Sequence, residues 1–407
     1  MSKWSRSRED STYAWVVVSA LAVTVTVSYG VLTYTFGIVL VPMQRELGWS
    51  RIELTGAFSL ALAVWAVAGV GVGIAIDRYS PRVLLAGGSA LAAGLVFGWS
   101  QVHERVQLYF VFAGLGVAMA TVLYNSVFAV VTKWFRVRRR QALTAITLVG
   151  AFSSFIFSPL AGTLTVAFGW REALAMLAVL LAIVTIPLHA ATLRPPPIPA
   201  HHESDPDCGG IARAAIASPR FWLLTASLAL GSYTWSVVIV QLVPFLSDSG
   251  HSLQFGALAA GVVGLGQLPG RLVFIFFGRA LGGRRLPAAT FGLAAIALTI
   301  LGLNRSEASV FVFAVIFGTS AGMMTLMSAS VPAELFGRQV YGAVSGVIYG
   351  FSNGARAVAP FASATIALLP GGYSTLLGSL VAVSGVAALL GFLAFTVSEA
   401  HPARHCV

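Results

Sequence analysis

Two arginines stand inside long apolar stretches of this sequence, where a charged side chain is costly unless it has a chemical role. Arg271 lies two-thirds of the way along residues 254–277, and Arg356 lies near the middle of residues 341–369. All 14 Asp and Glu residues fall in polar segments or in the last turns of the apolar stretches. A guanidinium group binds a carboxylate through two parallel hydrogen bonds. The pattern predicts that these arginines bind an anion; the alternative is that one of them bonds to helix carbonyls as part of the scaffold.

Uncharged polar side chains at a similar depth could complete such a site. Ser352 and Arg356 are four residues apart, so they share one face of a helix. Tyrosines near the ends of apolar stretches are usually interface anchors, which sets Tyr109 aside. The residues predicted to hydrogen-bond the rest of the anion are Tyr29, Tyr34, Tyr124, Asn125, Gln241, Ser352 and Asn353.

The composition of the 407-residue chain indicates a membrane protein. Hydrophobic residues make up 57% of it and charged residues only 10%, against about 25% charged residues in a typical globular domain. With a mean hydropathy of +0.86, too few polar side chains remain to cover a water-soluble core. A soluble protein, a disordered chain and a disulfide scaffold are excluded. The polar first ten residues and the long apolar run after them also do not resemble a cleavable signal peptide.

Twelve apolar stretches are long enough to cross a bilayer as helices, which takes roughly 20 residues each. They lie at residues 14–40, 54–76, 83–100, 107–131, 142–166, 173–191, 221–246, 254–277, 286–303, 309–331, 341–369 and 374–397.

The twelve stretches divide into two sets of six around a polar segment rich in proline and histidine. Two landmarks recur at an offset of 201 residues: Phe135 with Phe336, and residues 77–78 with residues 278–279. We therefore expect an all-α membrane protein of twelve transmembrane helices in two pseudo-symmetric six-helix halves, as in many transporters. The expected parts are an N-terminal half at 1–193, a cytoplasmic linker at 194–217 and a C-terminal half at 218–407.

Lysine and arginine predict the orientation in the membrane. Of the 25 such residues, 18 fall on the side of the two termini, five fall in the opposite loops and two lie within spans. By the positive-inside rule both termini are cytoplasmic. The basic cluster at 133–140 then faces anionic lipid headgroups. The net charge of +11 is explained in this way, and nucleic acid is not expected as a partner.

The sequence contains no arrangement typical of an enzyme. The glycine-rich residues 69–73 lie inside an apolar stretch and lack the strand–turn–helix context of a phosphate loop. His201 and His202 fit a solvated linker better than a metal site, and Cys208 and Cys406 suggest neither a metal site nor a disulfide. We expect no catalysis, no cofactor and no metal.

Residues 73–82 (GIAIDRYSPR) resemble the loop signature of the major facilitator superfamily, GxxxDRxGxR, with Ser80 in place of its second glycine. Residues 278–285 (GRALGGRR) form a degenerate copy without the acidic residue. The resemblance implies a transporter, and Asp77, Arg78 and Arg82 would then form a charge latch that breaks and re-forms as the halves rock.

A narrower resemblance is to the monocarboxylate transporters and the oxalate/formate antiporters. It rests on residues 41–50 (VPMQRELGWS), 134–140 (WFRVRRR), 168–171 (FGWR) and 266–271 (GQLPGR). The resemblance implies that Arg271 binds the substrate carboxylate and that Tyr124 lines the cavity. Two departures matter: Gln267 occupies the position of the aspartate of proton-coupled members, and Ser352 falls near the lysine of the oxalate antiporter, with Arg356 one turn away.

These observations predict a multi-pass inner-membrane secondary transporter for a small organic anion, a monocarboxylate first of all, with its site at the midplane between the halves. Arg271 would pair with the carboxylate, and Arg356 would engage a second acidic group or hold the charge balance. Proton-linked symport and anion exchange both stay open. The closest alternative is a dicarboxylate exchanger, followed by a phosphoanion carrier, a drug exporter and a transport-inactive membrane sensor. The expected partners are the anion, the lipid bilayer and, in the case of symport, protons; the chain is expected to be a monomer.

Overall fold

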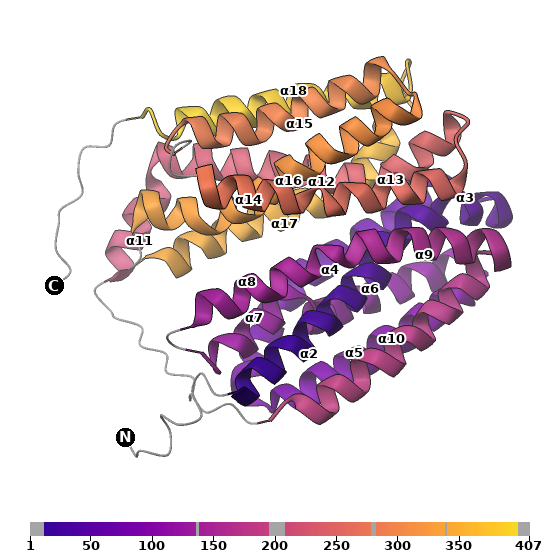
Figure 1. Ribbon diagram of the computed structural model, residues 1–407, viewed down its shortest axis with the longest axis horizontal. Helices are drawn as coiled ribbons and strands as arrows, with labels where there is room; N and C mark the ends of the chain where they lie inside the picture. The colour runs from indigo at the N-terminus through magenta and orange to yellow at the C-terminus, as the bar shows by residue number, and fades with distance from the viewer. Residues whose placement is uncertain (1–11, 136–137, 195–207, 278–281, 338–339, 398–407) are drawn as a thin grey trace. The chain divides into compact units, whose positions relative to one another are not determined.

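The computed structural model describes residues 12–135, 138–194, 208–277, 282–337 and 340–397. Throughout these ranges the regular structure is helical and no strand occurs (Figure 1), which confirms the predicted all-α class. The helices before the linker are α2 (Thr12–Tyr29), η1 (Gly30–Tyr34), α3 (Thr35–Leu47), α4 (Arg51–Arg78), α5 (Pro81–Ser100), α6 (Arg105–Val122), α7 (Tyr124–Thr132), α8 (Arg139–Gly150), α9 (Phe152–Phe168) and α10 (Trp170–Thr192). The later helices are α11 (Cys208–Ala217), α12 (Pro219–Asp248), α13 (Leu253–Leu265), α14 (Gln267–Phe277), α15 (Arg285–Leu303), α16 (Glu307–Phe336), α17 (Tyr341–Ile366) and α18 (Tyr373–Leu393).

Local sequence signals set several helix ends. Gly48 ends α3 with a positive φ of 66°, a conformation that glycine adopts without strain. Ser50 and Glu53 then form a reciprocal capping box at the start of α4, which satisfies two backbone N–H groups that the helix leaves free. Pro81 is the first residue of α5, where its missing N–H costs nothing.

Four of the expected spans are interrupted along their length. A five-residue π-helix, η1, separates α2 from α3. Single residues separate the other pairs: Leu123 between α6 and α7, Ala151 between α8 and α9, and Gly266 between α13 and α14. Such breaks free backbone groups and redirect side chains, and they are frequent at functional sites. Predicted substrate residues adjoin two of them, because Tyr29 lies directly before η1 and Tyr124 directly follows Leu123.

Among the described residues, eleven helical segments are long and apolar enough to cross a membrane. They account for every expected span except the eleventh, which corresponds to α17. That helix has 26 residues, but Gly, Ser, Asn and Arg356 interrupt its apolar residues. The chain is thus a multi-pass membrane protein, and the count of twelve spans stays a prediction, as does the orientation of the termini.

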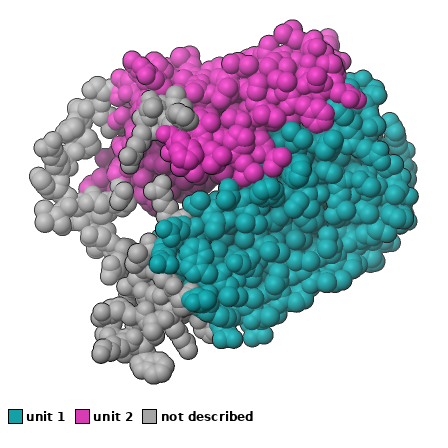
Figure 2. Space-filling view, viewed as in Figure 1, with its two compact units in different colours: residues 1–201, 240–264 teal, residues 202–239, 265–407 magenta. Residues whose placement is uncertain are grey.

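The helices pack into two compact units, shown in teal and magenta in Figure 2. Unit 1 contains residues 1–201 and 240–264, and unit 2 contains residues 202–239 and 265–407. The grouping by contacts therefore places the end of α12 and all but the last residue of α13 with the N-terminal helices. The sequence boundary proposed at 194–217 stays a prediction.

Close helix packing within each unit depends on small residues. In unit 1, a Cβ on Gly88 of α5 would overlap Thr121 of α6, and a Cβ on Gly116 of α6 would overlap the backbone of Ala61 in α4. In unit 2, α15 and α18 run side by side (Figure 1). Because lipid supplies no hydrophobic drive between helices, such backbone approaches provide much of the packing energy.

Candidate functional site

Arg271 lies one turn into α14, and glycines determine the position of this helix. A Cβ on Gly266 would lie 3.1 Å from the Ala314 carbonyl oxygen of α16, and a Cβ on Gly270 would overlap the Thr319 carbonyl. The contact is mutual, because a Cβ on Gly322 of α16 would overlap the backbone of Gln267. These glycines let the backbones of α14 and α16 approach closely, so the helix that carries Arg271 is held against α16.

Arg271 is buried, with 6% of its surface exposed, and its neighbour Gln267 is 7% exposed. Arg271 Nη2 donates a hydrogen bond to Gln267 Oε1 at 3.4 Å, one helical turn away. The amide oxygen orients the guanidinium but carries no charge.

The second predicted arginine lies on α17. Arg356 is half-buried, and its backbone carbonyl accepts a hydrogen bond from Ser236 Oγ of α12 at 3.0 Å, which fixes this turn of α17. Its Nε is shielded from solvent and has no hydrogen-bond partner among the described residues. Ser352 is 6% exposed one turn before it, and Asn353 is half-buried. A buried guanidinium N–H without an acceptor is unfavourable. A hydrogen-bond acceptor that reached Arg356 Nε would therefore lower the free energy.

In unit 1 the structure brings two of the predicted tyrosines together. Tyr29 ends α2 just before η1, and Tyr124 begins α7 after the Leu123 break. Their ring centroids are 4.7 Å apart, and Tyr124 also stacks on Phe128 with centroids 5.1 Å apart. Both tyrosines are half-buried. Two helix interruptions thus meet at one aromatic pair.

Gly150, the last residue of α8, determines where the Tyr124 hydroxyl can lie, because a Cβ there would overlap it. We predict that Gly150→Ala lowers the free energy of unfolding by about 1–3 kcal/mol through overpacking, and that adding Tyr124→Phe restores most of it. Thermal melting of detergent-solubilised protein measures both effects. Gly94→Ala is the control, since a Cβ there meets nothing within 4 Å. Equal destabilisation by the two glycine substitutions would contradict the assigned contact.

The remaining predicted residues have different surroundings. Tyr34 is half-buried in η1, and Gln241 of α12 is 3% exposed and groups with unit 1. Asn125, next to Tyr124, is exposed. Tyr29, Tyr34, Tyr124, Asn125 and Gln241 therefore belong to unit 1, whereas Arg271, Ser352, Asn353 and Arg356 belong to unit 2.

The predicted charge latch lies where α4 ends and α5 begins. The side chain of Asp77 lies outside the described part of the structure, and Arg78 and Arg82 are exposed. A contact that the sequence did not predict lies beside them: Lys133 Nζ donates a hydrogen bond to the Ile76 carbonyl oxygen at 2.8 Å. Lys133, predicted only as a headgroup anchor, thus also stabilises the C-terminal end of α4, where a cation is favourable.

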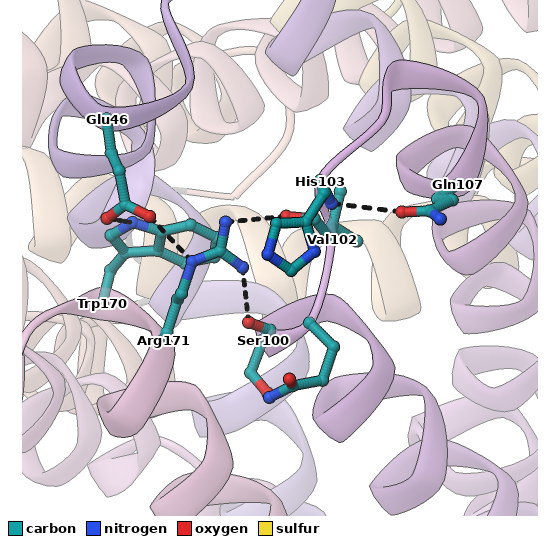
Figure 3. A network of polar contacts seen from close by, with 8 residues as sticks. Glu46, Ser100, Val102, His103, Gln107, Trp170 and Arg171 are labelled. Atoms are coloured by element: carbon teal, nitrogen blue, oxygen red, sulfur yellow. Dashed lines mark hydrogen bonds and ion pairs between the residues drawn. The ribbon is translucent and has the colours of Figure 1, made fainter.

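A polar network at the other end of unit 1 joins α3, α5 and α10 (Figure 3). Glu46 accepts hydrogen bonds from Trp170 Nε1 at 2.6 Å and from Arg171 Nε at 2.7 Å. Arg171 also donates to the carbonyl oxygens of Ser100 and Val102, each at 2.8 Å. The sequence analysis named residues 168–171 only as part of a family resemblance and predicted no contact for them. The structure shows that Trp170 and Arg171 fix the end of α3.

A family comparison identifies the architecture. The model of the Major Facilitator Superfamily matches residues 21–360, most of the chain. The chain belongs to this superfamily. The resemblance drawn from residues 73–82 is therefore confirmed.

Two relatives of this Major Facilitator Superfamily chain also agree with the narrower resemblance. Monocarboxylate transporter 13 of Rattus norvegicus is 27% identical over 343 residues, which cover 81% of this chain and 76% of the relative. The oxalate:formate antiporter of Oxalobacter formigenes is 26% identical over 339 residues, 78% of this chain and 76% of the antiporter.

Among solved structures, a bacterial homologue of the human lysosomal transporter Spinster matches with a TM-score of 0.77 and 16% identity, over 95% of this chain and 97% of that chain. At this identity the match shows the superfamily fold alone. The fold and the relatives are those of transporters rather than enzymes.

Proposed function

We propose that this chain is a secondary active transporter that moves a small organic anion, a monocarboxylate first of all, across the inner membrane by alternating access. The observation that carries the proposal is a pair of arginines on helices of unit 2, one buried on α14 and one half-buried on α17. Arg271 is 6% exposed, and Arg356 presents a shielded Nε that has no hydrogen-bond partner in the described part of the chain.

The chemistry of the guanidinium group leads from these arginines to a carboxylate. Its N–H donors lie in one plane with the spacing of two carboxylate oxygens, and pairing of the two groups is strong where water is excluded. All Asp and Glu residues lie outside the central parts of the apolar stretches, so a positively charged substrate would meet repulsion without compensation. Binding of an anion offsets the arginine charge, and a ligand shifts a conformational equilibrium only through such differential stabilisation.

The names of the two relatives support this substrate class. One is called a monocarboxylate transporter and the other an oxalate:formate antiporter. A dicarboxylate exchanger is the second candidate, and the observation that favours it is Arg356, a second cation in the same unit as Arg271. In that case Arg356 binds the second carboxylate, whereas in a monocarboxylate carrier it maintains the charge balance.

Gln267 limits how transport of the anion can be coupled to a proton. With an uncharged amide beside Arg271 and no carboxylate in the central parts of the spans, a proton either enters on the substrate or is not transported. We propose that Asp77, Arg78 and Arg82 form the cytoplasmic latch and that residues 1–193 and 218–407 are the two moving halves.

Uptake into proteoliposomes tests the proposal. Vesicles that contain purified protein should accumulate labelled lactate or formate faster than protein-free vesicles, and unlabelled carboxylate inside should accelerate entry if the protein exchanges anions. Faster entry of oxalate than of lactate would select the dicarboxylate candidate. Transport of organic cations with no response to carboxylates would refute both.

A further inference from the structure

The turn of α17 that carries Arg356 lacks one of the hydrogen bonds of a regular helix. In an α-helix the N–H of each residue donates to the carbonyl oxygen four residues earlier. Residue 360 is a proline inside α17, and proline has no backbone N–H. Pro360 therefore leaves the carbonyl oxygen of Arg356 without the donor that the helix would otherwise supply.

A side chain from another helix takes the place of that donor. Ser236 Oγ of α12 donates to the Arg356 carbonyl oxygen at 3.0 Å, and Ser236 is buried, with 6% of its surface exposed. On α17, the neighbouring Ala357, Ala359 and Pro360 are buried as well. Because a buried carbonyl group without a donor is unfavourable, this hydrogen bond holds the turn of Arg356 against α12.

The two turns of α17 before Arg356 are open on one side. Gly350 and Gly354 are exposed, and a Cβ placed on either of them would meet nothing within 4 Å among the described residues. Side-chain packing therefore does not hold this side of α17. The hydrogen bond from Ser236 contributes correspondingly more to the position of Arg356.

The part of α12 next to Ser236 is itself fixed on α15 and α16. Trp235 stacks on Phe317 of α16, with ring centroids 5.8 Å apart and an angle of 10° between the ring planes. One turn earlier, a Cβ on Gly231 would overlap Phe291 of α15. The helix α16 also lies against α14 through close glycine contacts. The helices of the two predicted arginines are thus connected through α16 and α12, within unit 2.

We propose that Ser236 is a positioning residue that determines how well this chain discriminates between substrates with two acidic groups and substrates with one. Its hydroxyl replaces the hydrogen bond that Pro360 removes and so holds Arg356 in a fixed place relative to Arg271. A single carboxylate needs only Arg271, whereas a second carboxylate on the same molecule needs Arg356 in the correct place. The role in selectivity rests on the proposed transport of carboxylates, but the replacement of the hydrogen bond can be measured without any substrate.

Thermal melting of detergent-solubilised protein tests the replacement. Ser236→Ala should lower the melting temperature, because the Arg356 carbonyl loses its donor. Pro360→Ala restores a backbone N–H at residue 360, so the helix itself can satisfy that carbonyl. In Pro360→Ala protein, Ser236→Ala should therefore lower the melting temperature by less than about half as much as in the wild type. Equal decreases in the two backgrounds would mean that Ser236 and residue 360 do not serve the same carbonyl, and the inference would be wrong.

Binding of formate and of oxalate tests the selectivity. We expect Ser236→Ala to raise the dissociation constant for oxalate about three- to tenfold, the range of a single hydrogen bond, and that for formate less than about twofold. Ser227→Ala is the matched control, because Ser227 also lies on α12, is 0% exposed and donates to the Ala387 carbonyl oxygen of α18 at 2.7 Å. This control should lower the melting temperature and leave the ratio of the two constants unchanged.

Arg356→Gln shows whether Ser236 acts through the arginine. In Arg356→Gln protein the preference for oxalate should already be reduced, and Ser236→Ala should reduce it no further. If the wild type binds formate but not oxalate, or if Ser236→Ala changes both constants equally, the inference is wrong while the proposed function stands. If neither anion binds the wild type, the carboxylate proposal fails together with the role of Ser236 in selectivity, and the melting experiment alone decides whether Ser236 replaces the hydrogen bond lost at Pro360.

Discussion

Purified protein that carries Arg271→Ala should melt no lower than the wild type, and formate or lactate should no longer stabilise it. The substitution removes a buried cation whose desolvation is unfavourable, so the empty protein loses little. It also removes the proposed anion contact. Each hydrogen bond to a charged group contributes about 1.5–3 kcal/mol, so the dissociation constant should rise at least about tenfold.

A thermal-shift titration measures this effect. A ligand that binds only folded protein adds about 2.7 kcal/mol of stability at one hundred times its dissociation constant, which gives a shift that can be resolved. Arg271→Lys keeps the charge without the planar pair of donors, so it should retain only part of the response.

The matched control is Arg220→Ala. Arg220 also lies in unit 2, where its Nε donates to the Ala394 carbonyl oxygen at 2.8 Å. Its removal should lower the melting temperature and leave the anion response intact. The same anion response in wild type and Arg271→Ala would show that Arg271 is part of the scaffold, and the carboxylate proposal would lose its main support.

The sequence singled out Arg271 because a single charge in a long apolar run is informative without any tertiary contact, and the structure shows this side chain to be buried. It could not predict the glycine contacts that hold α14, the helix of this arginine, against α16. Those contacts join Gly270 to Thr319 and Gln267 to Gly322, about fifty residues apart. Hydropathy records that a helix is apolar, not which of its faces meets a neighbour.

The helix breaks were missed for a related reason. Nothing in the composition of residues 30–34 distinguishes a π-helix from an α-helix, and Leu123 is not a helix-breaking residue. In the structure these two breaks adjoin Tyr29 and Tyr124, whose rings meet. Each tyrosine was predicted separately as a cavity residue, but their contact depends on tertiary packing that the sequence does not reveal.

The polar residues of α17 affected two predictions in opposite ways. They weakened the prediction that this helix spans the membrane and supported the prediction that it binds the substrate. Its Gly, Ser and Asn residues and Arg356 keep it out of the set of clearly apolar spans. The same residues made it a candidate binding helix. A helix that lines a polar site in a membrane cannot be as apolar as one that faces lipid, so span counting is least reliable where function concentrates.

Gln267→Glu should make the affinity for an anion depend on pH. In the wild type, no ionisable side chain is proposed to alter that affinity. The substitution places a carboxylate where Gln267 Oε1 now accepts from Arg271 Nη2. In its ionised form the introduced carboxylate would compete with the substrate for the guanidinium, and affinity for formate should fall at least about tenfold at about pH 8. As the pH falls, the new carboxylate protonates and becomes neutral like the native amide, so affinity should recover toward the wild-type value. The sign is therefore tighter binding at lower pH.

Dissociation constants for formate, which stays ionised across this range, should be compared between about pH 8 and about pH 5 in wild type and variant. The same substitution at Gln101, an exposed residue that follows α5, adds an equal charge away from Arg271 and should leave the pH profile unchanged. A profile for Gln267→Glu that parallels the wild type would mean that residue 267 does not face the bound anion. A recovery of affinity at low pH would show instead that residue 267 determines whether the site binds a proton together with the anion. With the native amide the site binds the anion alone, and with a carboxylate at the same position it binds the anion and a proton.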